Sequence, residues 1–102
     1  MTAHSESIHQ VILYTSERKP LLEGSLLSIV EQGFKNLPRR FPGLKILGHS
    51  IHPDRVEMSL DLQRLDEDLP RILQSFKSEV KNLAKKDGFA SHNLWQWTYE
   101  EK

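Results

Sequence analysis

Cysteine is absent from this chain of 102 residues, which excludes disulfide bonds and thiolate zinc sites. An excess of one charge is also missing, because 14 basic residues balance 14 acidic residues. A formal net charge of zero excludes attraction of nucleic acid by the field of the whole molecule. A basic binding patch therefore has to be local.

Long apolar runs are missing as well. No window approaches the roughly 20 apolar residues of a membrane-spanning helix, and residues 1–10 lack the basic start and apolar run of a signal peptide. We therefore expect a cytoplasmic protein with no membrane partner. The chain also has no internal repeat, Gly-rich phosphate loop or long linker, which predicts one compact domain over residues 1–102.

The first half of the chain predicts a strand, a helix and a hairpin. Residues 8–15 are rich in β-branched and aromatic side chains, which favours a central strand buried on both faces. A helix is predicted from about Glu23 or Ser25 to Leu37, with Ser25 as its N-cap and Pro38 as its stop. Residues 39–43 then read as a turn because they contain proline and glycine.

Two strands are predicted next, over residues 44–51 and 55–62, joined by a turn at Pro53 and Asp54 into an antiparallel hairpin. Apolar and polar residues alternate along the second of them. The apolar set is expected in the core, and the polar set is expected on an open sheet face. These outward residues are Arg55, Glu57, Ser59 and Asp61. The alternative for them is a plain solvated face.

The second half predicts another helix and a last strand. The helix follows the acidic residues 66–68, carries Pro70 in its first turn and ends at Gly88. Its apolar residues recur at spacings of three and four, so it should pack on the sheet. Residues 93–99 are aromatic and alternating, which predicts a fourth strand. The order strand-helix-strand-strand-helix-strand is typical of an α+β, ferredoxin-like fold, with a four-stranded antiparallel sheet and two helices on one face.

Three stretches carry a resemblance to a known family. They are PDRVEMSL at residues 53–60, LQSFKSEVKNLAKK at 73–86 and LWQWTYEE at 94–101, joined by the turn RKPLL at 18–22. Together they resemble the IS200-like tyrosine transposases, most closely the branch associated with repetitive extragenic palindromes. The resemblance implies the ferredoxin-like fold, DNA as partner, and DNA strand cleavage and transfer with Mg²⁺ or Mn²⁺.

The catalytic pattern of that family is degenerate here. Family members carry a His-hydrophobic-His pair after the hairpin turn, and both imidazoles leave one sheet face and bind the metal. The matching positions in this chain are Arg55 and Glu57, with Asp54 where the family has Asn. Arginine keeps its charge and does not ligate a metal. We therefore expect no native metal site and no intact catalytic residues, and an exposed Arg55–Glu57 ion pair instead.

The family's nucleophilic tyrosine lies on a helix after the Leu-Trp-Gln strand, in a segment reading Tyr-Ile and then Asn-Pro. No such segment occurs in the 102 residues, so the expected single domain lacks the helix of the catalytic tyrosine. Tyr99 aligns with an aromatic residue of the strand instead. His49 and His52 are three residues apart, which places them on opposite faces of a regular strand and makes them a poor ligand pair.

Basic residues make the better case for binding. Lys77, Lys81 and Lys85 recur at four-residue spacing on the second helix, and Arg39 and Arg40 stand together before the hairpin. With the two tryptophans, Trp95 and Trp97, they would supply charge and stacking for single-stranded or hairpin DNA. The alternative is a solvated helix face with acids such as Glu79 in between.

Two hypotheses follow. The first is a transposase-like domain that has kept the fold, and with it DNA binding, but has lost strand cleavage. The second is a protein-interaction or dimerisation module on the same fold, without nucleic-acid binding; the neutral net charge favours it. A small-molecule regulatory domain has the least support, because no ligand-specific motif is present. The resemblance leaves monomer and homodimer both open.

Overall fold

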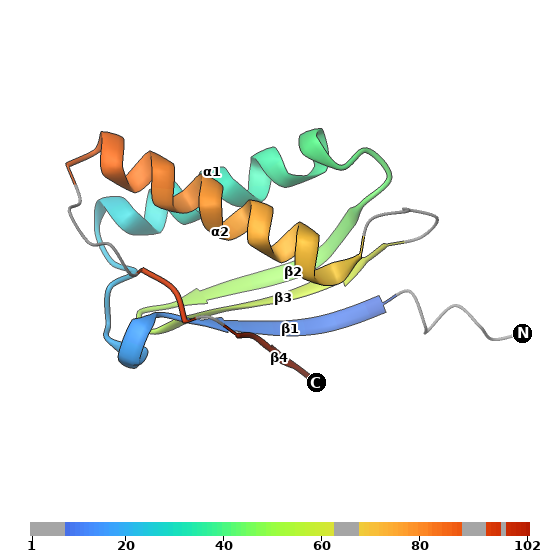
Figure 1. Ribbon diagram of the computed structural model, residues 1–102, viewed down its shortest axis with the longest axis horizontal. Coiled ribbons are helices and arrows are strands. Elements are labelled where there is room, and N and C mark those ends of the chain that lie inside the picture. Colours follow the sequence, from blue (N-terminus) through green and yellow to red (C-terminus); the bar gives the residue numbers. More distant parts are fainter. Residues whose placement is uncertain (1–7, 63–67, 89–93, 97) are drawn as a thin grey trace, which may run out of the picture.

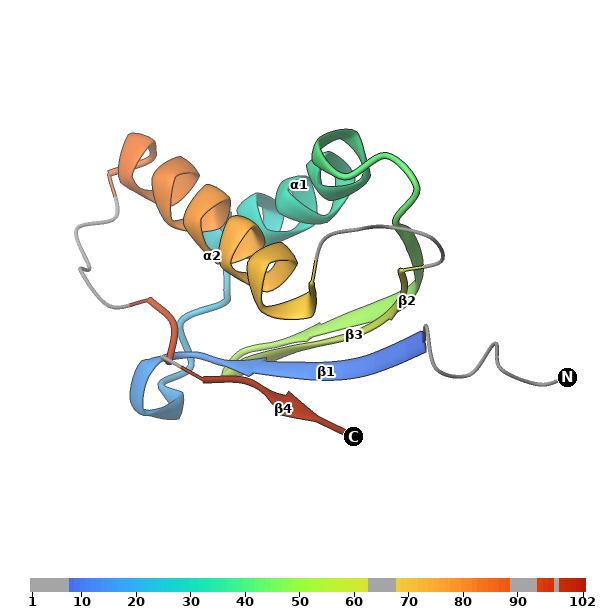
Figure 2. The ribbon, with the colours of Figure 1, turned by 45° about the vertical axis from the view of Figure 1, so that its right-hand side comes forward.

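The computed structural model describes residues 8–62, 68–88, 94–96 and 98–102. In chain order the elements are β1 (Ile8–Tyr14), the 3-10 helix η2 (Ser16–Arg18), α1 (Ser25–Arg40), β2 (Lys45–His52), β3 (Arg55–Asp61), α2 (Leu69–Lys86) and β4 (Glu100–Glu101). The strands form one antiparallel sheet in the order β2-β3-β1-β4. Figure 1 and Figure 2 show α1 and α2 together on one face of this sheet. The predicted ferredoxin-like α+β arrangement is confirmed.

Strand β1 is central, as its apolar run predicts. It pairs with β3 along its whole length, from Ile8↔Asp61 to Tyr14↔Arg55, and with the short β4 on its other side. Val11 and Leu13 belong to the main core, whereas Ile12 points to the open face, where it is only 7% exposed. The strand is therefore buried on both faces in its middle.

The two helices pack closely on each other at Gly33. A Cβ atom added at Gly33 would lie 2.8 Å from Val80 Cγ2 and 3.2 Å from Phe76 Cε1, inside normal contact distance. The absence of a side chain at Gly33 therefore lets the backbones of α1 and α2 approach each other closely. Phe76 of α2 packs beside this contact. Its ring lies 4.8 Å from the Phe34 ring, centroid to centroid, and 6.1 Å from the Trp95 ring.

The helix starts differ from each other. Asp68 caps α2, with its side chain accepting a hydrogen bond from the Arg71 N–H at 3.0 Å, and Pro70 sits in the first turn as predicted. The prediction of Ser25 as the N-cap of α1 is wrong. Ser25 is the first helical residue, and Gly24 precedes it at φ 61° without a side-chain cap. A positive φ of this kind favours glycine at that position.

Helix α1 passes through Pro38 and ends at Arg40, so the predicted stop at Leu37 is wrong. Arg39 and Arg40 form the last helical turn and are not part of a loop. Proline removes one backbone donor and usually breaks a helix interior. Here the helix continues past the proline to its end. Phe41 N–H donates to Leu37 O at 3.1 Å, and the side chains of both residues pack on the core.

The predicted last strand, residues 93–99, is only partly present among the described residues. Regular pairing with β1 occurs at β4, Glu100–Glu101, and residues 94–96 form a single isolated bridge, Thr15↔Trp95. Leu94 and Trp95 are consecutive and both buried, at 1% and 9% exposure, so the alternation expected of a half-buried strand is absent there. Residues 93 and 97 lie outside the described residues.

Candidate functional site

The open face of the β2–β3 hairpin carries polar side chains in cross-strand rows. Val56, Met58 and Leu60 of β3 are buried beneath the helices, whereas the residues between them are half-buried on the other face. The strand register sets two rows, Tyr14↔Arg55↔His52 and Ile12↔Glu57↔Ser50. The predicted alternation of β3 is confirmed.

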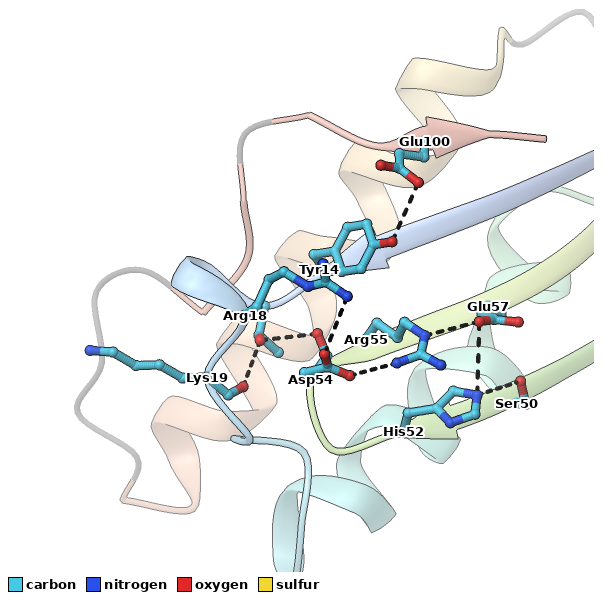
Figure 3. Close-up of polar contacts among 10 residues, drawn as sticks. Tyr14, Arg18, Lys19, Ser50, His52, Asp54, Arg55, Glu57 and Glu100 are labelled. Carbon is cyan, nitrogen blue, oxygen red and sulfur yellow. Dashed lines mark hydrogen bonds and ion pairs between the residues drawn. The ribbon is translucent and has the colours of Figure 1, made fainter.

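Arg55, at the start of β3, is the centre of the polar contacts on this face (Figure 3). Its Nε donates to Glu57 Oε2 at 2.9 Å, and its Nη1 donates to Asp54 Oδ1 at 2.9 Å. The hydrogen bond to Glu57 is the main cause that raises the pKa of Arg55. The same hydrogen bond lowers the pKa of Glu57, and the charge of Lys102 adds to that lowering. The guanidinium thus stands as a fixed cation between two carboxylates.

The polar network continues toward β4 (Figure 3). Arg18 lies 3.6 Å from the carboxylate of Asp54 and also stacks over the Tyr14 ring, at 4.3 Å from its centroid. The Tyr14 hydroxyl donates to Glu100 Oε1 at 3.3 Å. Basic and acidic side chains therefore alternate across this part of the face, and Arg18, Asp54, Arg55 and Glu57 each form an ion pair with a neighbour.

The turn that presents Arg18 has an unusual backbone. Glu17 and Arg18 both have φ of 55°, a left-handed conformation that is uncommon for residues with a side chain. Thr15, which is fully buried, holds this turn in place. Its hydroxyl lies 2.6 Å from Lys19 O and 3.1 Å from Asp54 O, so it ties the turn to the hairpin.

The arrangement around Arg55 does not suit a divalent cation. No group of three or more His, Asp or Glu side chains in the described part of the chain is placed to hold a metal ion. Arg55 already neutralises Asp54 and Glu57, and its charge would repel a second cation at that point. The histidines of the hairpin also diverge: His49 stacks on Phe34 of α1, whereas His52 lies 4.0 Å from Glu57 on the open face.

Some of the basic residues predicted to bind DNA are already paired with protein groups, and others are exposed without an ion pair. The two arginines at the end of α1 show both cases. Arg40 is engaged, because its Nε lies 2.9 Å from Glu79 Oε1 and its Nη1 lies 3.4 Å from Ser75 Oγ. Arg39 is exposed and forms no ion pair within the described residues. Only Arg39 of this pair is free to meet a phosphate.

The lysine row of α2 divides in the same way. Lys77 is half-buried and its Nζ donates to Gln96 O at 2.6 Å. This hydrogen bond connects α2 to residues 94–96. Burial lowers the pKa of Lys77. Lys81 and Lys85 are exposed on the following turns and have no ion pair among the residues the structure describes.

The structure does not join the arginines and lysines into one patch. Arg40 meets α2 at Ser75 and Glu79, and Glu79 follows Lys77 by two residues. Two residues on a helix are separated by roughly 200° of rotation, so the lysine row faces the opposite flank of α2. Arg39 and the exposed lysines therefore lie on separate parts of the helix layer.

Of the aromatic residues predicted to stack on bases, only Trp95 is described. It is 9% exposed and packs on Phe76, and its indole N–H has no hydrogen-bond partner within the described ranges. A ring in this position contributes to the core and offers no open face for a base. Trp97 lies outside the described residues. Tyr99 is half-buried and packs against the core cluster, as expected for an aromatic residue near the last strand.

The sequence did not predict a hollow that lies between α1 and β2. It is lined by the stacked rings of Phe34 and His49 and by Lys35. The sequence does hold one signal for it, because Lys35 precedes Arg39 by one helical turn. Nothing in the sequence shows that His49 lies against α1, since this contact joins residues 15 positions apart.

Comparisons with known proteins agree with this fold. A candidate transposase from Deinococcus radiodurans R1 superimposes with a TM-score of 0.75 at 16% identity, over 93% of this chain and 76% of that one. The REP-associated tyrosine transposase bound to a REP hairpin gives a TM-score of 0.74 at 16% identity, over 94% of this chain. The chain shares the fold of these transposases. It spans 55% of the length of the hairpin-bound protein.

Sequence comparison adds no further relative: no family model and no curated protein matches the chain. Within the described ranges, no helix is long and apolar enough to cross a membrane.

Proposed function

We propose that this chain is a transposase-like domain that binds single-stranded or hairpin DNA and does not cleave it. The fold it shares with two transposases, one of which is bound to a hairpin, supports DNA as the partner. The observation that carries the loss of cleavage is Arg55, whose guanidinium bonds Asp54 and Glu57 where a catalytic metal would need neutral imidazoles.

The distribution of charge supports binding through the helix layer. On the open face, Arg55 and Arg18 both have an acidic neighbour in Asp54. Arg39, Lys81 and Lys85 are exposed and form no ion pair within the described residues. Phosphate contacts made by such free cations would release counterions and give affinity without depending on net charge.

Loss of cleavage is tested by incubating the protein with end-labelled hairpin DNA and Mg²⁺ or Mn²⁺. We expect neither nicked DNA nor a covalent protein–DNA adduct on a denaturing gel. The variant Arg55→Lys is a matched control, because it keeps a positive charge and should be inactive as well. Nicking by the wild-type protein would overturn the assignment.

DNA binding is tested by gel shift with hairpin and unstructured oligonucleotides at about 50 mM and about 200 mM salt. We expect binding that weakens steeply with salt, and a shallower salt dependence for Lys81→Ala and Lys85→Ala, with about one unit of slope lost per phosphate contact. Ser78→Ala, on the exposed surface of the same helix, is the control and should bind like the wild-type protein. Absence of binding at both salt concentrations would refute this function.

A protein-interaction module is the second candidate, and strand β2 favours it. It is an edge strand of the sheet and carries Leu47, which is 50% exposed beside a bulge between Ile46 and Gly48. Unpaired edge strands accept further strands. If no oligonucleotide binds, and light scattering gives a dimer that Leu47→Lys dissociates, this second function is the correct one.

A further inference from the structure

The hollow beside the edge of the sheet has walls from two elements. Helix α1 contributes Glu31, Phe34 and Lys35, and the edge strand β2 contributes Ile46, Gly48 and His49. Because β2 has no neighbour on its outer side within the described sheet, the hollow opens to solvent along that edge. It lies away from Arg55, on the helix side of the sheet.

The hollow has an aromatic wall that is held rigidly. The rings of Phe34 and His49 are stacked, with centroids 4.2 Å apart and planes within 20° of parallel. Phe34 is itself 3% exposed and packs on Phe76, so its position is fixed by the core. His49 remains exposed. Since one face of the imidazole is covered by Phe34, its exposed area lies on the other face and the ring edge.

Strand β2 is irregular beside His49. A shift of register between Ile46 and Gly48 bends the strand next to it. Gly48 lines the hollow with its backbone, because it has no side chain. On this side the hollow is therefore bounded by main chain and by the His49 ring.

Positive charge stands at one end of the hollow. Lys35 lines it, and Arg39 follows one turn later on the same side of α1. Both are exposed, and neither forms an ion pair within the described residues. Glu31, one turn before Lys35, is the acid at the other end. An anionic group would therefore settle toward Lys35 and Arg39.

We propose that this hollow is a nucleotide-binding site for single-stranded DNA. An unpaired base stacks on the exposed face of His49, and the adjoining phosphates contact Lys35 and Arg39. Stacking on an aromatic ring tolerates every base, because each base has a π-face. The inference rests on the proposed DNA binding and assigns to it a base contact outside the open face of the sheet.

The test is a chemical double-mutant cycle measured by fluorescence anisotropy. One partner is a hairpin oligonucleotide with a short single-stranded tail, whose stem holds the register, compared with a set in which single residues of the tail are made abasic in turn. The other partner is the wild-type protein, His49→Ala, His49→Phe or His52→Ala. His52 lies three residues along the same strand, on the opposite face, and serves as the matched control.

We expect one abasic position to weaken wild-type binding by roughly fivefold or more. His49→Ala should weaken binding of the intact oligonucleotide by a similar factor and be insensitive to that abasic position. His49→Phe should keep the sensitivity, because it preserves the stacking ring, and His52→Ala should behave like the wild-type protein.

The possible outcomes distinguish a failure of this site from a failure of the proposed DNA binding. If the wild-type protein binds no oligonucleotide, the proposed DNA binding fails and this site fails with it. If the wild-type protein binds and His49→Ala shows the same abasic sensitivity, only the site at His49 is refuted. Thermal melts of the variants confirm that each is folded, which is expected because His49 is exposed.

Discussion

The seven residues of β3 divide between two faces of the sheet that differ in character. Toward the helices, Val56, Met58 and Leu60 are no more than 3% exposed and pack without polar partners. Toward solvent, Arg55 and Glu57 are half-buried and bond each other. The core face stabilises the fold through apolar burial, whereas the charges of the open face cancel among themselves. The charges around Arg55 thus pair with one another, whereas Arg39, Lys81 and Lys85 on the helices form no ion pair within the described residues.

Truncation of the core should have the largest effect. Phe76 is 1% exposed and joins Phe34 to Trp95, so Phe76→Ala removes contacts from both helices and from residues 94–96. We expect a loss of about 3–5 kcal/mol in unfolding free energy. Urea denaturation followed by circular dichroism measures it. A loss below about 1 kcal/mol would mean that the core is not organised around this ring.

Gly33→Ala tests the contact between the helices. Alanine favours a helix over glycine by about 1 kcal/mol, but its Cβ would lie 2.8 Å from Val80 Cγ2. Valine is stiff and cannot move its methyl group away cheaply. We expect overpacking, which costs roughly 1–3 kcal/mol, to exceed the helix gain and lower the melting temperature.

The variant Gly33→Ala/Val80→Ala provides the control for this clash. It removes the methyl group that the new Cβ meets, so its stability should exceed the sum of the two single effects. Strict additivity of the two substitutions would contradict the close approach at Gly33.

Glu57→Gln probes the open face through pH. The pKa of Glu57 is lowered in the folded protein from its ordinary value of 4.5, mainly by the hydrogen bond from Arg55. Its ionised form therefore favours folding above the unfolded-state pKa, and this contribution is lost as the pH falls through the lowered folded value. We expect the variant to be slightly less stable at about pH 7, and the difference to shrink as the pH falls through the lowered folded pKa. Urea titrations over a series of pH values from about 7 downward test this. A difference that does not change with pH would contradict the pairing.

Ser59→Ala should have the smallest effect. Ser59 belongs to the half-buried open face, opposite Gln10 of β1 and Gly48 of β2. Replacement of a surface residue away from special features usually changes stability by less than about 0.5 kcal/mol. Thermal denaturation measures the change. A shift as large as that of Gly33→Ala would show that the open face contributes to stability as the core does.

Much of the fold could be predicted because its signals are local. The alternation in β3 and the apolar stripe of α2 predicted which side chains are buried, and Asp68 and Pro70 marked the start of α2. The errors came where tertiary contacts outweigh local preference. Pro38 remains inside α1 because Leu37 and Phe41 are held by the core.

The candidate site was predictable only in part. The pairing of Arg55 and Glu57 follows from their spacing of two on a strand, and the structure contains the hydrogen bond between them. The availability of each predicted DNA contact did not follow from spacing. Arg40 pairs with Glu79, and Lys77 donates a hydrogen bond to Gln96 O. Both partners lie far from these residues in the sequence.

By itself, the sequence determined the order of the main elements, the buried faces of β3 and α2, and the position of Arg55 and Glu57 on one face of a strand. These depend on residue type and on periods of two or about 3.6 residues, which local order preserves. Only the tertiary structure decided which cations are free, that Trp95 belongs to the core and that His49 stacks on Phe34. Such facts depend on distances between segments remote in the chain, and the packing of the core sets these distances.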